Sequence, residues 1–443
     1  MAADAAPEGL DGIRTWLEAF SERLLRPYLT SLNTRRFSRE HKVVNDLIWQ
    51  TVSISPFETV FLDSPIVQRL RRIRQLGVVH WVYPNAVHSR FEHSIGALHQ
   101  VSQLCRAINS DEELVPESFR KLLRLTALCH DLGHGVMSHV SENALRNRQD
   151  VRRLERQFAR QFGEENANLS EIAAYYMIGS PAFGELLKAA QEITGEHDLP
   201  DHALEKMQRC VVGQVISDEL PLIHELISGP FDADKLDYLP RDAHICGVPV
   251  VTDIPRLTEK VKGIRIREDE LPPRVAQKVQ GGKVSYLMMG IALSGGRTLD
   301  ELILGRTLLF DKIYRHHKVR AVEAMVASIL LQTAEILSPI PALAGYCLVD
   351  EELLDLSEER LRTLAGRDLT QREAGLVRVA ADIAGRLGQR NLFARCFSFS
   401  KTMPLDPYSA DAAQRTGLER LQREAANYVE RAKCQGSRKS GQS

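Results

Sequence analysis

The stretch Cys129-His130-Asp131-Leu132-Gly133-His134-Gly135 places an adjacent histidine and aspartate between an apolar periodic segment and two glycines. The apolar spacing in residues 119–129 predicts a helix, and glycine commonly follows a helix end. Imidazole nitrogen and carboxylate oxygen are both good ligands for divalent metals. We therefore expect His130 and Asp131 to be metal ligands held at the end of a helix.

Two further residues extend this donor set along the chain. His93 lies in R-F-E-H, and Asp234 lies in F-D-A-D-K-L-D-Y. A metal that keeps open positions can generate hydroxide near neutral pH and polarise a phosphoryl oxygen, which is the chemistry of phosphoester hydrolysis. The donors suit one divalent ion, and the sequence does not distinguish manganese, iron, magnesium, zinc and nickel. They also leave room for a second metal.

The composition limits the function classes. The 443 residues are 44% hydrophobic and 26% charged, with a formal net charge of -1, so no global basic field favours bulk nucleic-acid binding. The sequence contains no apolar run of 18 residues, so it predicts no membrane span. The N-terminus does not resemble a secretory signal. The cysteines are scattered, odd in number and without C-x-x-C spacing. We expect a cytoplasmic location, where thiols stay reduced.

Helical periodicity predicts a mainly α fold with four parts. These are an N-terminal helical segment (1–40), a core (41–335) with a charged, solvated insertion (141–168), a helical C-terminal region (336–433) and a disordered tail (434–443). Alternation around Gly281-Gly282 predicts a small β-hairpin over 272–289. Predicted helices cover 10–33, 64–76, 93–108, 119–129, 169–190, 203–228, 299–337, 350–390 and 411–433.

Four longer motifs carry a family resemblance. They are Q-R-L-R-R-I-R-Q-L-G, Y-P-N-A-V-H-S-R-F-E-H-S-I-G, H-D-L-G-H-G-V-M-S-H and D-A-D-K-L-D-Y-L-P-R-D. Together they resemble the HD-domain phosphohydrolases, and within them the deoxynucleoside triphosphate triphosphohydrolases, from about residue 42 to 330. Some members of that branch join a SAM domain to the HD domain, and the short N-terminal segment does not resemble one. The resemblance implies a helical HD-domain core and a homo-oligomer.

The resemblance also implies roles for individual residues. By position, His93, His130, Asp131 and Asp234 bind the metal, while His134 and His139 line the cleft and Glu142 supports His139 as the general acid. The residues implied for phosphate binding are Arg90 and Lys235. Those implied for the sugar are Gln75, Tyr238 and Asp242.

One position departs from the family pattern. The branch has a further histidine on the helix after the H-D-L-G-H-G segment, where this chain has Asn166 or Asn168. Asparagine forms hydrogen bonds but does not transfer protons near neutral pH. Three readings follow. His139 with Glu142 suffices, His197 or His202 folds over the site, or the protein acts on another phosphoester or on none.

Two basic clusters admit more than one role. Arg69, Arg71, Arg72 and Arg74 are consistent with a structural role, with a regulatory nucleotide or with single-stranded nucleic acid. The run Lys312, Arg315, His316, His317, Lys318 and Arg320 fits a second phosphate-binding face or a solvated helix face.

The function favoured by these residues is cleavage of a (deoxy)nucleoside triphosphate to nucleoside and triphosphate. Two alternatives stay open. One is a metal-dependent phosphodiesterase or nuclease acting on cyclic nucleotides or single-stranded nucleic acid. The other is a nucleotide-binding assembly module with little turnover. Neither alternative involves a membrane.

Overall fold

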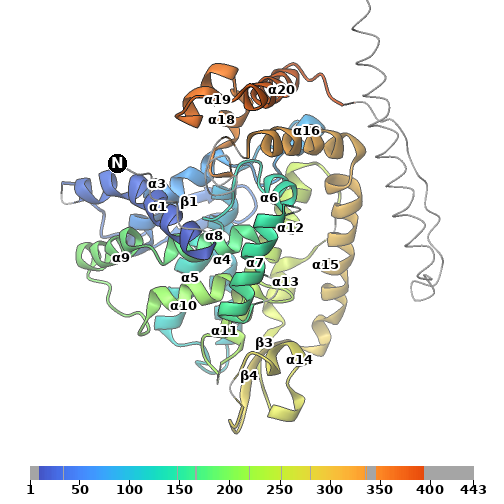
Figure 1. Cartoon of the computed structure of the whole chain (residues 1–443). Coiled ribbons are helices and arrows are strands. Elements are labelled where there is room, and N and C mark those ends of the chain that lie inside the picture. The colour runs from blue at the N-terminus through green and yellow to red at the C-terminus, as the bar shows by residue number, and fades with distance from the viewer. Residues whose placement is uncertain are drawn as a thin grey trace, which may run out of the picture. The chain divides into compact units, whose positions relative to one another are not determined.

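Helices dominate the computed structural model (Figure 1). It describes residues 9–393 apart from 33, 147, 165–166, 219, 251, 280, 335 and 337–345. The mainly α fold predicted from the sequence is confirmed, and the helix expected over 10–33 is present as α1 (Leu10–Leu32). The helix expected over 411–433 and the tail 434–443 lie outside the described residues.

The other described α-helices follow here in chain order. Before the site they are α2 (Pro56–Leu62), α3 (Pro65–Gln68), α4 (Arg90–Ile108) and α5 (Glu117–Cys129). The middle of the chain contains α6 (His139–Leu145), α7 (Gln149–Phe162), α8 (Leu169–Ile178), α9 (Pro181–Thr194), α10 (Ala203–Val211), α11 (Leu222–Ser228), α12 (Ala233–Ile245), α13 (Ile254–Glu259) and α14 (Pro273–Ala276). The last described helices are α15 (Gly296–Leu309), α16 (His317–Thr333), α18 (Asp350–Leu354), α19 (Glu358–Ala365) and α20 (Gln371–Gly388).

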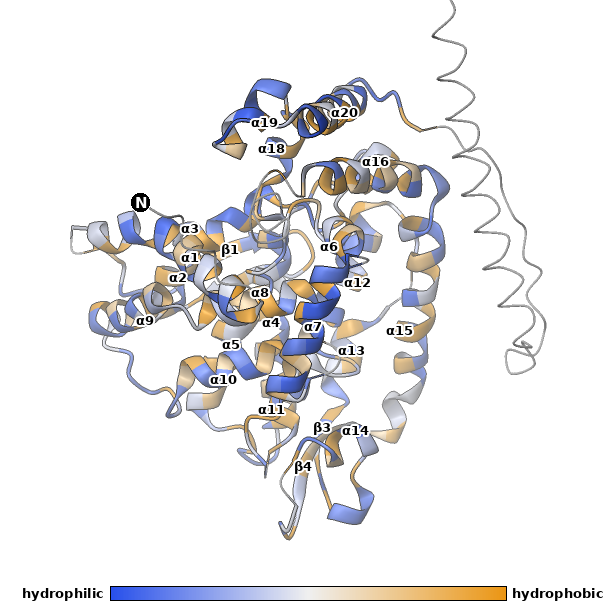
Figure 2. Ribbon diagram, in the orientation of Figure 1, coloured by the Kyte–Doolittle hydropathy of each residue, from blue (hydrophilic) through white to orange (hydrophobic). Residues whose placement is uncertain are grey.

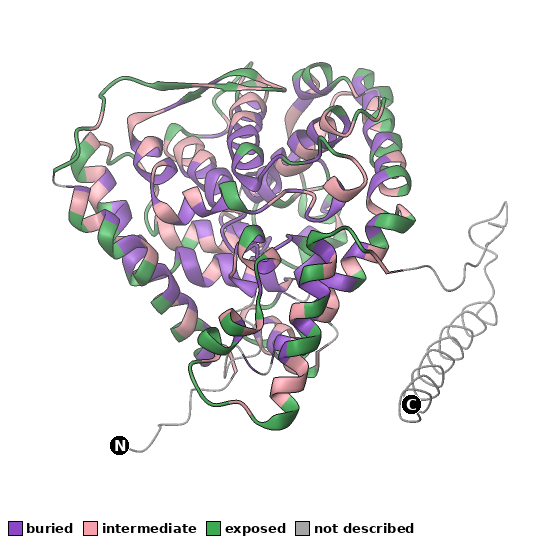
Figure 3. Cartoon of the chain, turned by 90° about the horizontal axis from the view of Figure 1, so that it is seen from above, coloured by how far each residue is buried: buried purple, intermediate pink, exposed green. Residues whose placement is uncertain are grey.

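The helix α4 is the centre of the packing that positions the site. It contacts α5 on one side and α12 on another. Figure 3 shows that the central helices are largely buried while the outer ones expose one face, and Figure 2 shows apolar residues turned inward along them. Because α4, α5 and α12 each carry expected metal ligands, this packing brings residues from three distant segments together.

Two small antiparallel sheets accompany the helices, and one differs from the prediction. Strands β1 (Lys42–Asp46) and β2 (Gln50–Ile54) form a hairpin that the sequence pattern did not reveal. Strands β3 (Val261–Ile266) and β4 (Tyr286–Ile291) pair with each other. The predicted hairpin over 272–289 is therefore wrong, because its first half forms α14. Proline at the start of that segment cannot donate to a ladder but suits the first turn of a helix.

The helix predicted over 64–76 also ends early. Its helical part comprises α3 and the 3-10 turn η1 (Arg69–Arg72). Beyond it the backbone N–H of Gln75 donates to His88 O at 3.0 Å, and that of Arg90 donates to Ile73 O at 2.9 Å. These tertiary bonds hold the segment after η1 in an extended conformation. They place Gln75 beside the start of α4.

Several other expectations need refinement. The predicted helix 203–228 is two helices, α10 and α11, with Gly213 at a positive φ of 78° between them. The charged stretch 141–168 contains α7, which buries Val151, Leu154 and Phe158 and keeps its arginines exposed. The expected boundaries at 40/41 and 335/336 stay a prediction. None of the described helices is long and apolar enough to cross a bilayer.

Candidate metal centre and phosphate-binding pocket

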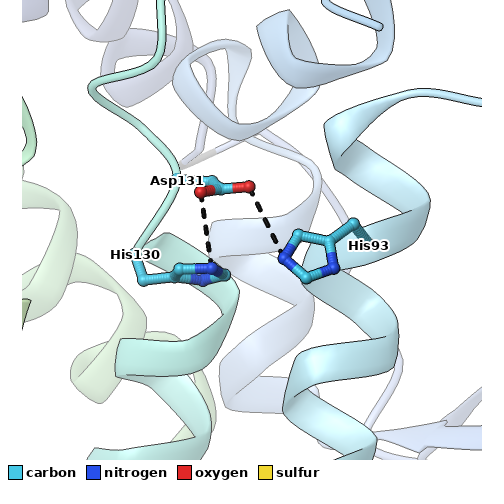
Figure 4. A group of neighbouring side chains, drawn as sticks. All are labelled: His93, His130 and Asp131. Atoms are coloured by element: carbon cyan, nitrogen blue, oxygen red, sulfur yellow. Dashed lines mark ion pairs between the residues drawn. The ribbon is translucent and has the colours of Figure 1, made fainter. Parts of the chain in front are cut away.

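The four expected metal ligands lie together. His93 is in the first turn of α4, His130 and Asp131 follow α5, and Asp234 is in the first turn of α12. The Nε2 atom of His93 lies 3.7 Å from Asp131 Oδ2 and 2.9 Å from Asp234 Oδ1. The Nε2 atom of His130 lies 3.4 Å from Asp131 Oδ1 and 3.9 Å from Asp234 Oδ1. Figure 4 shows Asp131 between the two imidazoles. The four side chains thus form one cluster.

The hydrogen bonds of the two histidines favour metal binding. His93 Nδ1 lies 2.8 Å from Asp237 Oδ2, and His130 Nδ1 lies 2.7 Å from Ala127 O. These acceptors place the ring proton on Nδ1 and leave a lone pair on Nε2. Both Nε2 atoms are buried without a hydrogen-bond partner. Metal-binding histidines characteristically donate their second ring N–H to a carboxylate or carbonyl. The donor set therefore fits a divalent metal.

The electrostatics point the same way. Burial lowers the pKa of His93, but Asp234 and Asp237 beside the ring outweigh burial and raise this pKa to about 10. Burial opposes ionisation of Asp131, and the Arg90 guanidinium outweighs it, so the pKa of Asp131 lies well below its usual range. The carboxylates thus surround the ring with negative potential, and without a metal His93 keeps a proton on Nε2 near pH 7, beside Asp234. A bound cation would be stabilised by the same potential.

A second layer of residues, which the sequence did not suggest, supports His93. Asp237 is fully buried and receives a hydrogen bond from Trp49 as well as His93. Arg241 donates to both oxygens of Asp237 at 2.8 and 2.9 Å, and it also pairs with Asp46 Oδ2 at 2.9 Å. The spacing of Asp237 three residues after Asp234 was a usable signal, because it puts both on one helix face.

Glycine on α4 makes room for this layer. A Cβ atom at Gly96 would lie 1.8 Å from Asp237 Oδ1 and 2.4 Å from Arg241 Nη2. Any larger residue would displace the carboxylate that orients His93. The close approach of α4 to α12 at this point is therefore part of the site.

The residues expected to handle protons form a second group. His139 Nδ1 lies 3.0 Å from Glu142 Oε2, and the His134 and His139 rings meet edge to face with centroids 4.9 Å apart. Burial, aided by Arg90, lowers the pKa of His134 to about 4, so its ring is neutral near pH 7. His139 is 63% exposed on its side chain and lines the pocket, so its Nε2 can reach a bound molecule.

The structure also describes one of the asparagines that replace the family's further histidine. Asn168 caps α8 by accepting from Glu171 N at 3.0 Å, and Ser170 Oγ lies 2.7 Å from its side-chain oxygen. Ser170 N lies 3.2 Å from Glu142 Oε1, so the start of α8 anchors the partner of His139. Burial opposes ionisation of Glu142, but His139 outweighs it and lowers this pKa to about 2. Asn166 lies outside the described residues.

The reading in which His197 or His202 completes the site is wrong. Both are exposed, in or next to the connection between α9 and α10, and neither lines the pocket. His202 begins α10 with a left-handed backbone. The pocket instead receives Glu171, which sequence reasoning did not single out. Burial raises the pKa of Glu171 to about 7, and the nearby Glu142 and Asp234 add to the effect.

The expected substrate-binding residues all border one cavity of about 600 Å³, together with Asp131, Asp234 and His139. Arg90 donates from Nη1 to Asp131 at 2.7 Å, while its buried Nη2 has no partner. Lys235 Nζ contacts Asp232 Oδ2 at 2.6 Å. Gln75 is 8% exposed, and its side-chain oxygen is buried without a partner. All three residues line a space of ordinary ligand size.

Tyr238 and Asp242, the pair expected on the sugar side, are more constrained by their surroundings than expected. Asp242 lies 2.9 Å from His88 Nε2 and accepts from Tyr314 OH at 2.6 Å. Both of its oxygens therefore have partners before any ligand binds. Tyr238 lines the cavity and burial raises its pKa far above the usual range. The Tyr314 hydroxyl joins this wall of the cavity, which the sequence did not indicate.

Two residues of the basic run 312–320 contribute to the same cavity, and the other four do not line it. Arg315 and Arg320 line it, as does Arg306 of α15, which no motif had indicated. Arg320 pairs with Glu323, and Arg315 lies 3.7 Å from Asp311. His316 and His317 stack on each other at 4.5 Å. The cavity thus has cations on two walls.

The arginine cluster 69–74 has structural partners. Arg69 is buried and donates to His134 O at 3.0 Å and Cys347 O at 3.2 Å. Arg71 covers the Phe91 ring, while Arg72 and Arg74 pair with Glu351 and Asp350. These contacts favour the structural role over nucleic-acid or regulatory-nucleotide binding. They also join residues near the site to a segment far along the chain.

Comparison with known proteins agrees with this geometry. Residues 90–218 match the family model described as HD domain. That segment contains His93, His130 and Asp131. The predicted resemblance to HD-domain proteins is confirmed.

Individual relatives point within that family. The chain is 26% identical over 372 residues to a deoxynucleoside triphosphate triphosphohydrolase SAMHD1 homologue of Dictyostelium discoideum, covering 82% of this chain and 61% of the relative. It is 30% identical over 248 residues to the Bos taurus deoxynucleoside triphosphate triphosphohydrolase SAMHD1, covering 52% and 41%. An uncharacterised Methanocaldococcus jannaschii protein is 26% identical over 286 residues, covering 64% and 48%. The chain therefore spans only about half the length of these relatives.

Proposed function

We propose that this chain is a metal-dependent phosphohydrolase that converts a deoxynucleoside triphosphate to a nucleoside and inorganic triphosphate. The observation that carries the proposal is the convergence of two features on one cavity. The unpartnered Nε2 atoms of His93 and His130 lie beside Asp131 and Asp234, and the His139–Glu142 pair borders the same space. Relatives named as triphosphohydrolases of deoxynucleotides support the substrate class.

The metal would be held by His93, His130, Asp131 and Asp234. When bound, a divalent ion with open positions supplies Lewis acidity at a phosphoryl oxygen and lowers the pKa of water. Asp237 and the Ala127 carbonyl hold the two imidazoles in the tautomer that such binding requires.

The cations around the cavity would bind the phosphate chain. Arg90 has an unpaired buried N–H group, and Arg306 is a wall residue for which the described chain shows no acidic partner. Lys235, next to Asp234, adds a third positive charge. Fixed donors aimed at a triphosphate need no reorganisation when charge develops, which is usually a large contribution to phosphoryl transfer.

The opposite wall would hold the nucleoside. Gln75 offers a free side-chain oxygen to a sugar hydroxyl, and Tyr238 offers a ring face against the sugar. Asp242, fixed by His88 and Tyr314, narrows this end of the cavity. Because His88, Asp242 and Tyr314 are already paired with one another at this end of the cavity, a sugar with an additional hydroxyl would be disfavoured there.

In the reaction, the oxygen of water forms a bond to the α-phosphorus and the bond between that phosphorus and the nucleoside 5′-oxygen breaks. His139 donates a proton to the leaving oxygen, and Glu142 orients the imidazole through Nδ1. One proton of the water is released to solvent. The products are the nucleoside and triphosphate.

Product analysis tests the proposal. Purified protein is incubated with manganese, iron or magnesium and with each deoxynucleoside triphosphate, singly and mixed, and ion-exchange chromatography separates the products. Asp131→Ala removes a ligand, so we expect at least a 10³-fold loss of turnover together with loss of bound metal. Asp368→Ala, an exposed acid far from the cavity, is the matched control.

The products separate the alternatives. Nucleoside plus triphosphate, with ¹⁸O from labelled water in the triphosphate, supports the proposal. Release of monophosphate and diphosphate would place the cut elsewhere. Turnover only of bis-p-nitrophenyl phosphate or a cyclic nucleotide would favour a phosphodiesterase, and binding without any turnover would favour an assembly module.

A further inference from the structure

The loop that connects the metal ligand Asp131 to the proton donor His139 has an unusual backbone. Met137 and Ser138 have φ angles of 54° and 53°, in the left-handed region that non-glycine residues rarely adopt. Each such residue costs about 1 kcal/mol or more, and it persists only where surrounding contacts enforce it. Ser138 directly precedes α6 and His139. The position of His139 therefore depends on whatever holds this backbone.

Residues 346–350 supply those contacts. Val136 N donates to Tyr346 O at 2.9 Å, and Met137 N donates to Asp350 Oδ1 at 2.7 Å. A Cβ atom on Gly135 would lie 2.4 Å from Tyr346 O, so the two segments are in close contact there. Two successive N–H groups of the loop are thus bound from a segment more than 200 residues away in sequence.

The second oxygen of Asp350 reaches another wall of the cavity. Asp350 Oδ2 accepts from Arg74 N at 2.9 Å, immediately before Gln75. Ser138 Oγ donates to Arg74 O at 2.5 Å and accepts from Arg90 Nε at 2.7 Å. One buried carboxylate therefore ties the Gln75 segment to the His139 loop. The same junction holds Arg90, which pairs with Asp131.

We propose that Asp350 is a positioning residue, which fixes the strained loop before His139 and the segment before Gln75 in their active geometry. It does not line the cavity and acts through the backbone of Met137 and Arg74, with the Arg74 guanidinium 3.7 Å from its Oδ2 atom. Asp350 has no exposed surface, and burial raises its pKa to about 6, so this carboxylate is retained at an electrostatic cost. Its charge-assisted bonds to two backbone N–H groups are stronger than those a neutral side chain would accept.

The test rests on the proposed function only in its kinetic part. Asp350→Asn keeps the shape but turns one acceptor into a donor facing an N–H group. We expect kcat to fall about 10- to 100-fold, because a displacement of about 1 Å at a reacting group can have that effect. KM should rise at the same time, because Asp350 also fixes the backbone before Gln75, whereas bound metal should stay at the wild-type level, since Asp350 contacts none of the proposed metal ligands. Glu351→Gln, on an adjacent and exposed acid, should match the wild type.

Amide hydrogen exchange supplies a readout that needs no substrate. In the wild type, the Met137 and Val136 amides should exchange slowly, and in Asp350→Asn they should exchange at least tenfold faster while the amides of α4 and α5 keep their protection. If Asp350→Asn does not fold, slow exchange of Met137 in the wild type still supports the proposal, and fast exchange there overturns it.

Two other results would overturn the proposal. One is a folded Asp350→Asn with wild-type kcat. The other is a loss of kcat that follows only the unfolded fraction as temperature is varied. If no substrate is turned over by any variant, the proposed function fails while the exchange data still decide the role of Asp350.

Discussion

The metal ligands and the proton-donor loop keep their geometry by opposite means. His93 and Asp234 lie on packed helices, and Asp237, which is itself held by Arg241, accepts from His93 within the same helix pair. The loop of residues 131–138 has little regular structure, and its backbone is bound by Asp350, 213 residues away from Met137. The comparison teaches that the metal centre is supported locally, whereas the reacting geometry depends on a distant segment. A substitution in the metal-ligand cluster should therefore affect metal binding, and a substitution that disturbs the loop before His139 should affect kcat, each without the other.

The largest separable effect is expected at His139. His139→Gln keeps a polar side chain but removes proton transfer, so we expect kcat to fall about 10²- to 10⁴-fold. Metal content, measured by mass spectrometry of the purified protein, should not change. His197→Gln, on an exposed histidine outside the cavity, is the control. Loss of metal in His139→Gln would contradict this comparison, because the metal-ligand cluster and the loop before His139 would then not be independent.

Substitutions in the layer of residues that supports His93 should have a smaller effect, which is expected on metal affinity. Asp237→Asn weakens the partner of His93 Nδ1, and substitutions of this kind typically lower metal affinity about 10- to 100-fold. Competition with a chromogenic chelator measures the affinity. Asp46→Asn reaches Asp237 only indirectly, through Arg241 and through the turn that carries Trp49, and should have a weaker effect in the same direction. Equal affinities in all three proteins would show that the ligands alone set metal binding.

The smallest effect is expected at Glu171, which lines the cavity but belongs neither to the metal-ligand cluster nor to the loop before His139. Its pKa of about 7 in the folded protein lies above the usual 4.5, so the native state holds this proton more tightly than the unfolded state. Ionisation therefore destabilises the fold as pH rises from about 5 to 8. Glu171→Gln has no such charge and should gain roughly 1–3 kcal/mol relative to the wild type across that interval.

Urea unfolding of both proteins at pH 5 and pH 8 measures this difference, because the other titrating groups are shared. A difference between variant and wild type that is the same at both pH values would show that Glu171 ionises normally. Glutamine preserves the acceptor for Asn168 N, so the start of α8 should be retained.

The sequence predicted the cluster of His93, His130, Asp131 and Asp234, which stays a proposed metal site, because these residues occur in compact motifs. His130-Asp131 follows an apolar helix and precedes glycine, and Arg90 and His93 share a helix face at a spacing of three. The His139–Glu142 pair was predictable for the same reason. The fold class followed from helical periodicity, although the alternation of Val275, Gln277 and Val279 suggested a strand where Pro272 and Pro273 begin a short helix.

Residues that act across long distances could not be predicted. Asp350 occurs in an ordinary acidic helix start, and nothing local distinguishes it from Glu351 beside it. Arg306 and Tyr314 reach the cavity only through the packing of α15 and the π-helical turn η5 (Phe310–Tyr314) that follows it. The parts proposed for the chain, its self-association and its cellular location stay predictions.

The bond between Asp350 and Met137 also has a consequence for biosynthesis. Every proposed metal ligand has been synthesised once residue 234 is complete, and the segment that matches the HD domain ends at residue 218. The acceptors that hold the loop before His139 are translated more than 100 residues later. The proposed metal ligands are therefore available early in synthesis, whereas the loop before His139 obtains the contacts that hold it only after residues 346–350 have been translated.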